Sequence, residues 1–165
     1  MQPHDWSRFH LRLPINADRQ TIFRYWTNQH DLEQWFLRKA EFRKPDKTLR
    51  DRSEPIRVGD TYEWMWHGWP DEVIERGTVM ELGPLHLKFS FGKGGNVTVT
   101  VNEEMTTSIL ELIQDDIPTD ETSKVNFHIG CTKGWLFYMV NLKSLLEGGP
   151  DMRNRNEQLK EVINS

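Results

Sequence analysis

The densest group of side chains suited to binding chemistry is aromatic. Tyr62, Trp64 and Trp66 occupy alternate positions of one segment, so a β-strand would project all three from the same face. Trp69 follows in an expected turn. Tyrosine and tryptophan join a large apolar ring to one O–H or N–H group, which suits the wall of an apolar small-molecule site. The same spacing is typical of a core stripe that fills the fold, and both interpretations stay open.

A helix-forming segment near the C-terminus carries the expected partners of this strand. His128, Trp135 and Met139 share one side of a helix at about 100° per residue. Phe89 and Phe91, on another expected strand, complete the predicted lining of a cavity between sheet and helix. Methionine adapts to irregular pockets, and histidine has an unperturbed pKa of about 6.5. Methionine at this spacing is also typical of a core, and a single helical histidine often only forms hydrogen bonds.

Covalent catalysis has little support in these residues. Cys131 follows His128 by three positions, which places both on roughly one side of the helix. A Cys–His nucleophile needs a depressed thiol pKa and an oxyanion site, and the amides of a helix interior are already hydrogen-bonded. We therefore expect a buried, inert thiol and assign no catalytic residue.

Metal and phosphate binding are not indicated either. The six histidines, at 4, 10, 30, 67, 86 and 128, show no paired ligand spacing. The glycine-rich run at 92–95 joins two expected strands and does not precede a helix, so it is typical of a hairpin turn. We expect neither a metal nor a cofactor.

Charge and composition narrow the class of protein. The chain has 165 residues, a net charge of −4, seven Trp, eight Phe and a single Cys. Mixed charges of this kind do not favour nucleic-acid or anionic-membrane binding, and one cysteine forms no internal disulfide. The N-terminus lacks the features of a signal peptide, and no apolar run approaches the roughly 18 residues of a membrane span. These observations predict one domain in the cytoplasm.

Two charged segments could face solvent or a partner. Residues 38–57 hold eight Lys or Arg against four acids, and residues 103–121 hold only acids among their charged side chains. The simpler interpretation is a solvated strand-and-loop for the first and a solvated face for the second. Partner contact by charge complementarity is the alternative.

Alternation and turn residues predict the elements that position these side chains. Strands are expected at 6–14, 60–67, 72–82, 85–91, 96–103 and 106–115, with two short helices between the first two of them. Asp18 is the expected cap of the first short helix. A long helix is expected over about 122–147, and its wide apolar side predicts that the domain encloses more than half of its circumference.

Two features of the C-terminal part are left open. Gly130 and Gly134 lie inside the long helix, where each costs about 1 kcal/mol relative to alanine. Close approach of another backbone, or a bend, would explain them. Residues 151–165 form a polar tail, with a short helix expected around 157–163.

The order of strand, two short helices, meander and long helix is the helix-grip arrangement, and particular motifs sharpen the resemblance. The chain resembles the AHSA-type family, which takes its name from activators of a heat-shock chaperone ATPase and belongs to the START-like (SRPBCC, birch-pollen-allergen-like) superfamily. The resemblance covers about residues 6–153. It is carried by Gly59-Asp60-Thr61-Tyr62-Glu63-Trp64, Gly77-Thr78-Val79, Leu87-Lys88-Phe89-Ser90-Phe91, Gly130-Cys131-Thr132-Lys133-Gly134-Trp135 and Asn141-Leu142-Lys143-Ser144-Leu145-Leu146-Glu147-Gly148-Gly149.

The resemblance implies an α+β helix-grip fold: a curved antiparallel sheet of six to seven strands holding the long helix. It implies one START-like domain over residues 1–150, followed by the tail 151–165. START-like domains bind hydrophobic ligands, so we expect non-enzymatic binding of a small hydrophobic or amphipathic molecule in the cavity.

Two alternatives follow from the same resemblance. The first is a co-chaperone-like interaction module with a role in stress response. The activators that name the family carry a further N-terminal chaperone-binding domain, which these residues do not supply. The second is a START-like cyclase or hydrolase, for which His128 and Tyr62 are the available acid–base groups.

Overall fold

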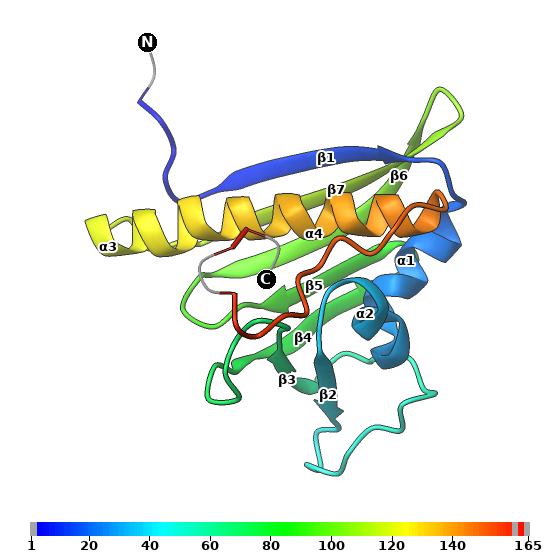
Figure 1. Ribbon diagram of the computed structural model, residues 1–165, viewed down its shortest axis with the longest axis horizontal. Helices are drawn as coiled ribbons and strands as arrows, with labels where there is room; N and C mark the ends of the chain where they lie inside the picture. Colours follow the sequence, from blue (N-terminus) through cyan, green and yellow to red (C-terminus); the bar gives the residue numbers. More distant parts are fainter. Residues whose placement is uncertain (1–2, 160–161, 164–165) are drawn as a thin grey trace.

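Seven strands form one antiparallel sheet in the order β1-β7-β6-β5-β4-β3-β2, which confirms the expected α+β helix-grip class (Figure 1). The computed structural model describes residues 3–159 and 162–163. The strands are β1 (Phe9–Ile15), β2 (Lys39–Arg43), β3 (Thr61–Met65), β4 (Glu75–Gly83), β5 (His86–Ser90), β6 (Asn96–Glu104) and β7 (Thr107–Asp115). The meander falls within a few residues of the expected strands. β2 is the strand within the basic segment, and its inward Ala40 and Phe42 are buried.

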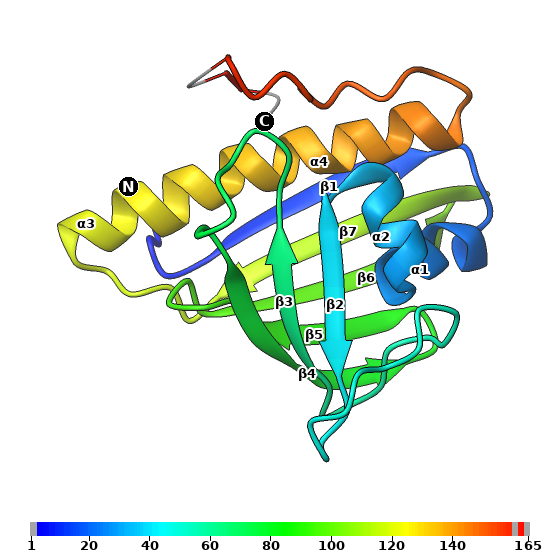
Figure 2. The ribbon, with the colours of Figure 1, turned by 60° about the horizontal axis from the view of Figure 1, so that its bottom comes forward.

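Two short helices, α1 (Arg19–Thr27) and α2 (Gln29–Trp35), lie between β1 and β2 at one end of the sheet (Figure 2). Side chains cap both, as expected at helix N-termini. Asp18 accepts a hydrogen bond from the Thr21 amide at 2.9 Å, and Asn28 accepts one from the His30 amide at 3.0 Å. Ile22, Trp26 and Trp35 of these helices are almost fully buried in the core.

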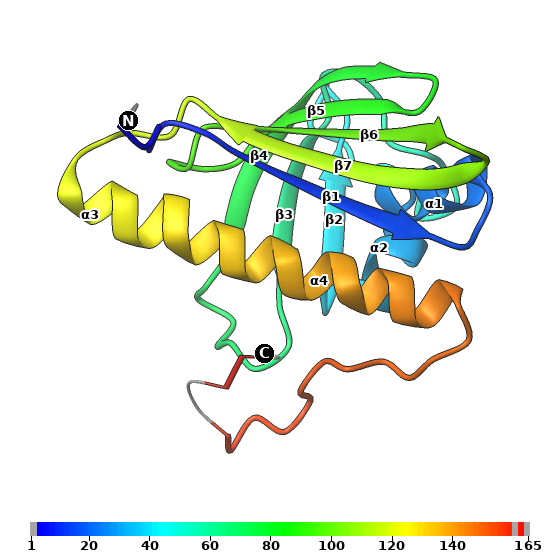
Figure 3. The same ribbon diagram turned by 90° about the horizontal axis from the view of Figure 1, so that it is seen from above.

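The long helix runs without interruption through α3 (Glu121–Ser123), the π-helical turn η1 (Lys124–Ile129) and α4 (Gly130–Leu146). Asp120 caps it by accepting a hydrogen bond from the Ser123 amide at 3.0 Å. Figure 3 shows this helix lying across one face of the sheet.

The expectation that the domain encloses more than half of this helix is wrong. Val125, Ile129, Leu136 and Val140 are 59%, 42%, 51% and 37% exposed. The sheet covers the helix from one side only. In addition, the wider π turn changes the angle per residue, so a count at a constant angle misplaces residues on either side of it.

A buried ion pair ties the β2–β3 connection to the sheet. Arg50 is 6% exposed and Asp60 is fully buried. The Arg50 guanidinium donates to both carboxylate oxygens of Asp60, and Nη2 lies 2.7 Å from Oδ1. The Asp60 carboxylate also accepts a hydrogen bond from the Arg57 amide at 2.8 Å. The middle of this long connection is therefore fastened to its last residue, directly before β3.

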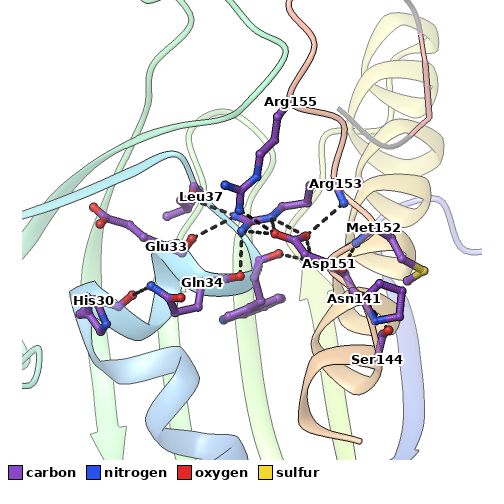
Figure 4. Close-up of polar contacts among 12 residues, drawn as sticks. His30, Glu33, Gln34, Leu37, Asn141, Ser144, Asp151, Met152, Arg153 and Arg155 are labelled. Carbon is purple, nitrogen blue, oxygen red and sulfur yellow. Dashed lines mark hydrogen bonds and ion pairs between the residues drawn. The ribbon is translucent and has the colours of Figure 1, made fainter. Parts of the chain in front are cut away.

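A second polar cluster fastens the segment after α4 to the end of α2 (Figure 4). The Arg153 guanidinium donates to the carbonyl oxygens of Glu33, Gln34 and Leu37 at 3.1, 2.7 and 3.1 Å, and to the Asp151 carboxylate. Arg153 thus satisfies the free carbonyls that a helix leaves at its C-terminus. We call this set of residues, together with Asn141, the α2 clamp.

Asn141 contributes to the clamp from α4, where it joins the end of α2 to the segment after α4. Its Nδ2 donates to the Trp35 carbonyl at 2.8 Å, and its Oδ1 accepts from the Met152 amide at 2.8 Å. The expected short helix around 157–163 is not present over residues 157–159, which include a turn, and residues 160–161 lie outside the described residues.

The Asp151 carboxylate makes the clamp sensitive to acid. Its burial opposes ionisation, but hydrogen bonds from the Arg153 side chain and amide and from Arg155 outweigh burial and hold the pKa of Asp151 well below its usual range. A depressed folded-state pKa contributes stability that is present above the unfolded pKa of about 3.9 and is lost as the pH falls through the folded-state value. We expect Asp151→Asn to lower stability at neutral pH.

The same variant should lose less stability than the wild type when the pH falls from about 5 to about 2.5. Thermal melts across this range measure the difference between the two proteins, which removes the contribution of the other carboxyl groups. Glu72 is exposed, so the variant Glu72→Gln is the control for the loss of one acidic group. Parallel curves for wild type and Asp151→Asn would contradict the assignment.

Candidate functional site

A pocket of about 250 Å³ opens between the concave face of the sheet, α4 and the loop that joins β3 to β4. The lining comes from the residue after α2, the β3–β4 loop, the residue after β5 and α4: Phe36, Trp66, Trp69, Val73, Phe91, Cys131, Gly134, Trp135 and Tyr138. Larger hollows exist beside Lys143 and Glu147 and beside Arg43 and Arg76, but charged side chains line them. The aromatic pocket is therefore the candidate site, since ligand pockets are mostly apolar.

The wall of this pocket is built around Phe36. Its ring centroid lies 5.8 Å from Trp66, 5.1 Å from Trp135 and 5.0 Å from Tyr138. Phe91 extends the wall, 5.4 Å from Trp135. Such separations are those of favourable aromatic pairs, so contacts between the rings stabilise the pocket wall.

Gly134 explains part of the open space. A Cβ atom built on Gly134 would meet no atom within 4 Å. Neither close approach of another backbone nor a local clash requires glycine here; its missing side chain leaves room in the pocket. Gly130 differs, because it follows the π turn and its Cβ would lie 3.4 Å from the Val125 carbonyl oxygen.

The structure divides the predicted lining residues into two groups and one outlier. Trp66, Phe91 and Trp135 border the pocket. The other sheet residues and the methionine lie deeper, at most 3% exposed, and are packed as core: Tyr62, Trp64, Phe89 and Met139.

Packing in this deeper region leaves little space. The Tyr62 and Trp64 rings stack at 3.9 Å, and the void beside them measures only about 10 Å³. The inward side chains of β3 are thus filled core, and only Trp66, the residue after this strand, borders open space.

His128 is the outlier, because it lies near the N-terminal segment and away from the pocket. Its Nε2 lies 3.0 Å from Nε2 of His4, and its ring is 5.1 Å from Trp6 and 5.6 Å from Phe9. His4 and Trp6, which precede β1, pack on the first turns of the long helix and cover this side chain. Burial and the neighbouring His4 both lower the pKa of His128.

Gln114 is a polar residue of the site that the sequence does not single out. It is fully buried on β7, where its Oε1 accepts from Trp135 Nε1 at 2.9 Å and its Nε2 donates to the Gly94 carbonyl at 2.7 Å. Gln114 therefore fixes the orientation of the pocket residue Trp135.

Glu75 is a second polar residue near the pocket that the sequence analysis does not single out. It pairs with Trp64 across β3 and β4, so its side chain belongs to the concave face. A signal existed in the sequence: alternation places Glu75 on the same side as Gly77 and Val79, where a charged residue is unusual.

Few titratable groups line the pocket. Burial raises the pKa of the Cys131 thiol to about 11, and burial likewise raises the pKa of the Tyr138 hydroxyl. Both groups are protonated at neutral pH, so neither serves as a base or an activated nucleophile. Within residues 3–159 and 162–163, no three histidine, cysteine or acidic side chains gather in a way that could hold a metal ion.

These observations define the class of protein: a START-like helix-grip domain with an aromatic pocket between sheet and helix. The family model described as Activator of Hsp90 ATPase homolog 1-like protein matches residues 16–147, and the chain belongs to this family. Among curated proteins, no sequence match was found. Across the part of the chain that the structure describes, no helix combines the length and apolar character that crossing a bilayer requires.

Solved structures share the fold at low sequence identity. Protein SSP2350 from Staphylococcus saprophyticus is 16% identical with a TM-score of 0.67, covering 88% of this chain and 96% of its own. The Aha1 dimer from Colwellia psychrerythraea is 16% identical with a TM-score of 0.64, covering 86% and 97%. DynU16, described as a putative protein in the dynemicin biosynthetic locus, is 17% identical with a TM-score of 0.64, covering 90% and 50%.

Proposed function

We propose that this domain binds a small apolar or amphipathic molecule, without catalysing a reaction, in the pocket bordered by Phe36, Trp66 and Trp135. The observation that carries the proposal is the aromatic lining of a solvent-accessible space of about 250 Å³ between sheet and helix. That volume is close to the lower end of known ligand sites, which suits a small molecule. The raised pKa values of Cys131 and Tyr138 support binding over catalysis.

The fold relatives give modest further support. DynU16 is described as a protein of a biosynthetic locus for a small molecule, dynemicin. A binding role for small molecules is in keeping with such a setting.

A protein-interaction role is the second candidate, and the exposed side of the long helix favours it. Val125, Ile129, Leu136 and Val140 present apolar surface there. The family description names an activator of a chaperone ATPase. Capture of purified Hsp90 by the wild type but not by a Leu136→Lys variant, with a matching change in ATPase rate, would support this second role.

Gly134 provides the test of the pocket. Gly134→Leu should fill the open space and weaken binding of the neutral fluorescent probe N-phenyl-1-naphthylamine by about tenfold or more, because the added side chain takes the place of the ligand. Gly134→Ala should reduce binding much less, and it should stabilise the protein by about 1 kcal/mol through its higher helix propensity. Fluorescence titrations and thermal melts measure both effects.

Two controls place the probe in this pocket. Gly130→Ala changes helix propensity in the same helix without touching the lining residues. Cys131 is the only cysteine of the chain and lines the pocket, so bound probe should slow its alkylation by N-ethylmaleimide. Unchanged binding in a folded Gly134→Leu variant would rule out this pocket as the site.

A further inference from the structure

Glu75 stands on the concave face without a charged partner. It is the first residue of β4, and its side chain lies on the same face as that of Trp64, its cross-strand neighbour. The carboxylate reaches Gly92: a Cβ atom on that glycine would lie 2.2 Å from Glu75 Oε1. The same oxygen accepts a hydrogen bond from the Arg76 amide at 3.2 Å.

No Lys, Arg or His within the described ranges forms an ion pair with this half-buried carboxylate. Arg76, the next residue, points to the opposite face and pairs with Glu63 at 2.9 Å. Burial raises the pKa of Glu75, and the Arg76 amide and charge offset this only in part. A half-buried carboxylate without a counter-charge is costly, so a ligand of opposite charge would stabilise this group.

Glu75 does not itself line the aromatic pocket, but its carboxylate lies beside Gly92, which follows the lining residue Phe91. Its charge acts on the Cys131 thiol of α4 and on the Tyr62 hydroxyl of β3, both of which are protonated at neutral pH. Cys131 and Phe91, the neighbour of Gly92, line the pocket. Several aromatic rings of the pocket therefore lie near the half-buried carboxylate of Glu75, and aromatic rings attract organic cations.

We infer that the molecule bound in this pocket carries a protonated amine or quaternary ammonium group, and that Glu75 selects it by charge. This inference rests on the proposed binding function and adds the chemical class of the ligand. The opposite arrangement, in which a protonated Glu75 donates a hydrogen bond to a neutral ligand, is distinguished by the experiment below.

Two probes of equal shape test the charge. (1-Naphthylmethyl)trimethylammonium is a cation, and 1-neopentylnaphthalene is its neutral carbon isostere. Glu75→Gln keeps the size of the side chain and removes its charge. We expect the variant to bind the cation about tenfold more weakly while the neutral isostere changes by no more than about twofold, because only the cation loses an ion pair.

Glu72→Gln is the matched control, since it removes the same formal charge from an exposed position on the β3–β4 loop beside the pocket. Its effect on the cation should stay within about twofold, as for a screened surface charge. Isothermal titration gives the affinities, and circular dichroism confirms that each variant is folded.

The outcomes separate the two proposals. If the neutral isostere binds and Glu75→Gln leaves cation affinity unchanged, or weakens both probes equally, the charge assignment is overturned and the pocket stands. If neither probe binds the wild type, both proposals fail. If Glu75→Gln does not fold, 1-naphthylacetate on the wild type decides: the inference requires this anion to bind about tenfold more weakly than the cation.

Discussion

Asp60→Asn is expected to lower the free energy of unfolding by about 3–5 kcal/mol, because it leaves the guanidinium of Arg50 buried without its counter-charge. Asp60 is fully buried. Arg50 contacts both of its carboxylate oxygens, and the Arg57 amide contacts one of them. The remaining partner of Arg50, Glu54, lies at the surface and is 41% exposed at its side chain. It compensates poorly for the lost pair.

Urea titration of wild type and variant measures the effect, which corresponds to a fall in melting temperature of roughly 10 °C for a chain of this length. Arg52→Met is the matched control. Arg52 pairs with Glu33 at the surface with 55% of its side chain exposed, so its loss should cost at most about 1 kcal/mol. Equal losses in the two variants would show that burial of the Arg50–Asp60 pair is unimportant.

Arg153→Met is expected to be similarly costly, about 3–5 kcal/mol, because it removes the donor to three carbonyl oxygens and the main partner of Asp151. The methionine keeps an apolar stem of comparable length, so the loss reports the guanidinium. Arg155→Met is the control, since Arg155 also pairs with Asp151 but is 61% exposed.

The α2 clamp should also affect the pocket. The carbonyls that Arg153 holds, those of Gln34 and Leu37, flank Phe36, whose ring is the centre of the pocket wall. We therefore expect Arg153→Met to weaken binding of N-phenyl-1-naphthylamine under conditions in which the variant is still folded. Full stability with unchanged binding would show that the clamp does not position this end of α2.

Much of the architecture could be predicted because it depends on local periodicity. Alternation in Val97, Val99 and Val101 identified β6, since in a sheet with one covered face every second side chain must be apolar. Asp18 marked a helix start because its side chain satisfies a free amide there. The family motifs then gave the arrangement of these elements.

The site could be predicted only in part, because its lining comes from distant segments. Trp66, Phe91 and Trp135 were found, whereas Phe36 follows α2 and gave no signal of its own beyond an apolar helix face. His128 has the helical spacing of a lining residue, yet the segment containing His4 and Trp6 covers it. Spacing along one element does not reveal what packs against it.

The aromatic strand from Tyr62 to Trp66 shows this division most clearly. The sequence by itself determined that the three rings share one face, because strand geometry leaves no alternative. Only the tertiary structure decided that Tyr62 and Trp64 fill the core while Trp66 borders a pocket. The reason is that open space depends on which volumes meet across the fold: a glycine on α4, a phenylalanine after α2 and a loop before β4 leave one gap, which no single segment encodes.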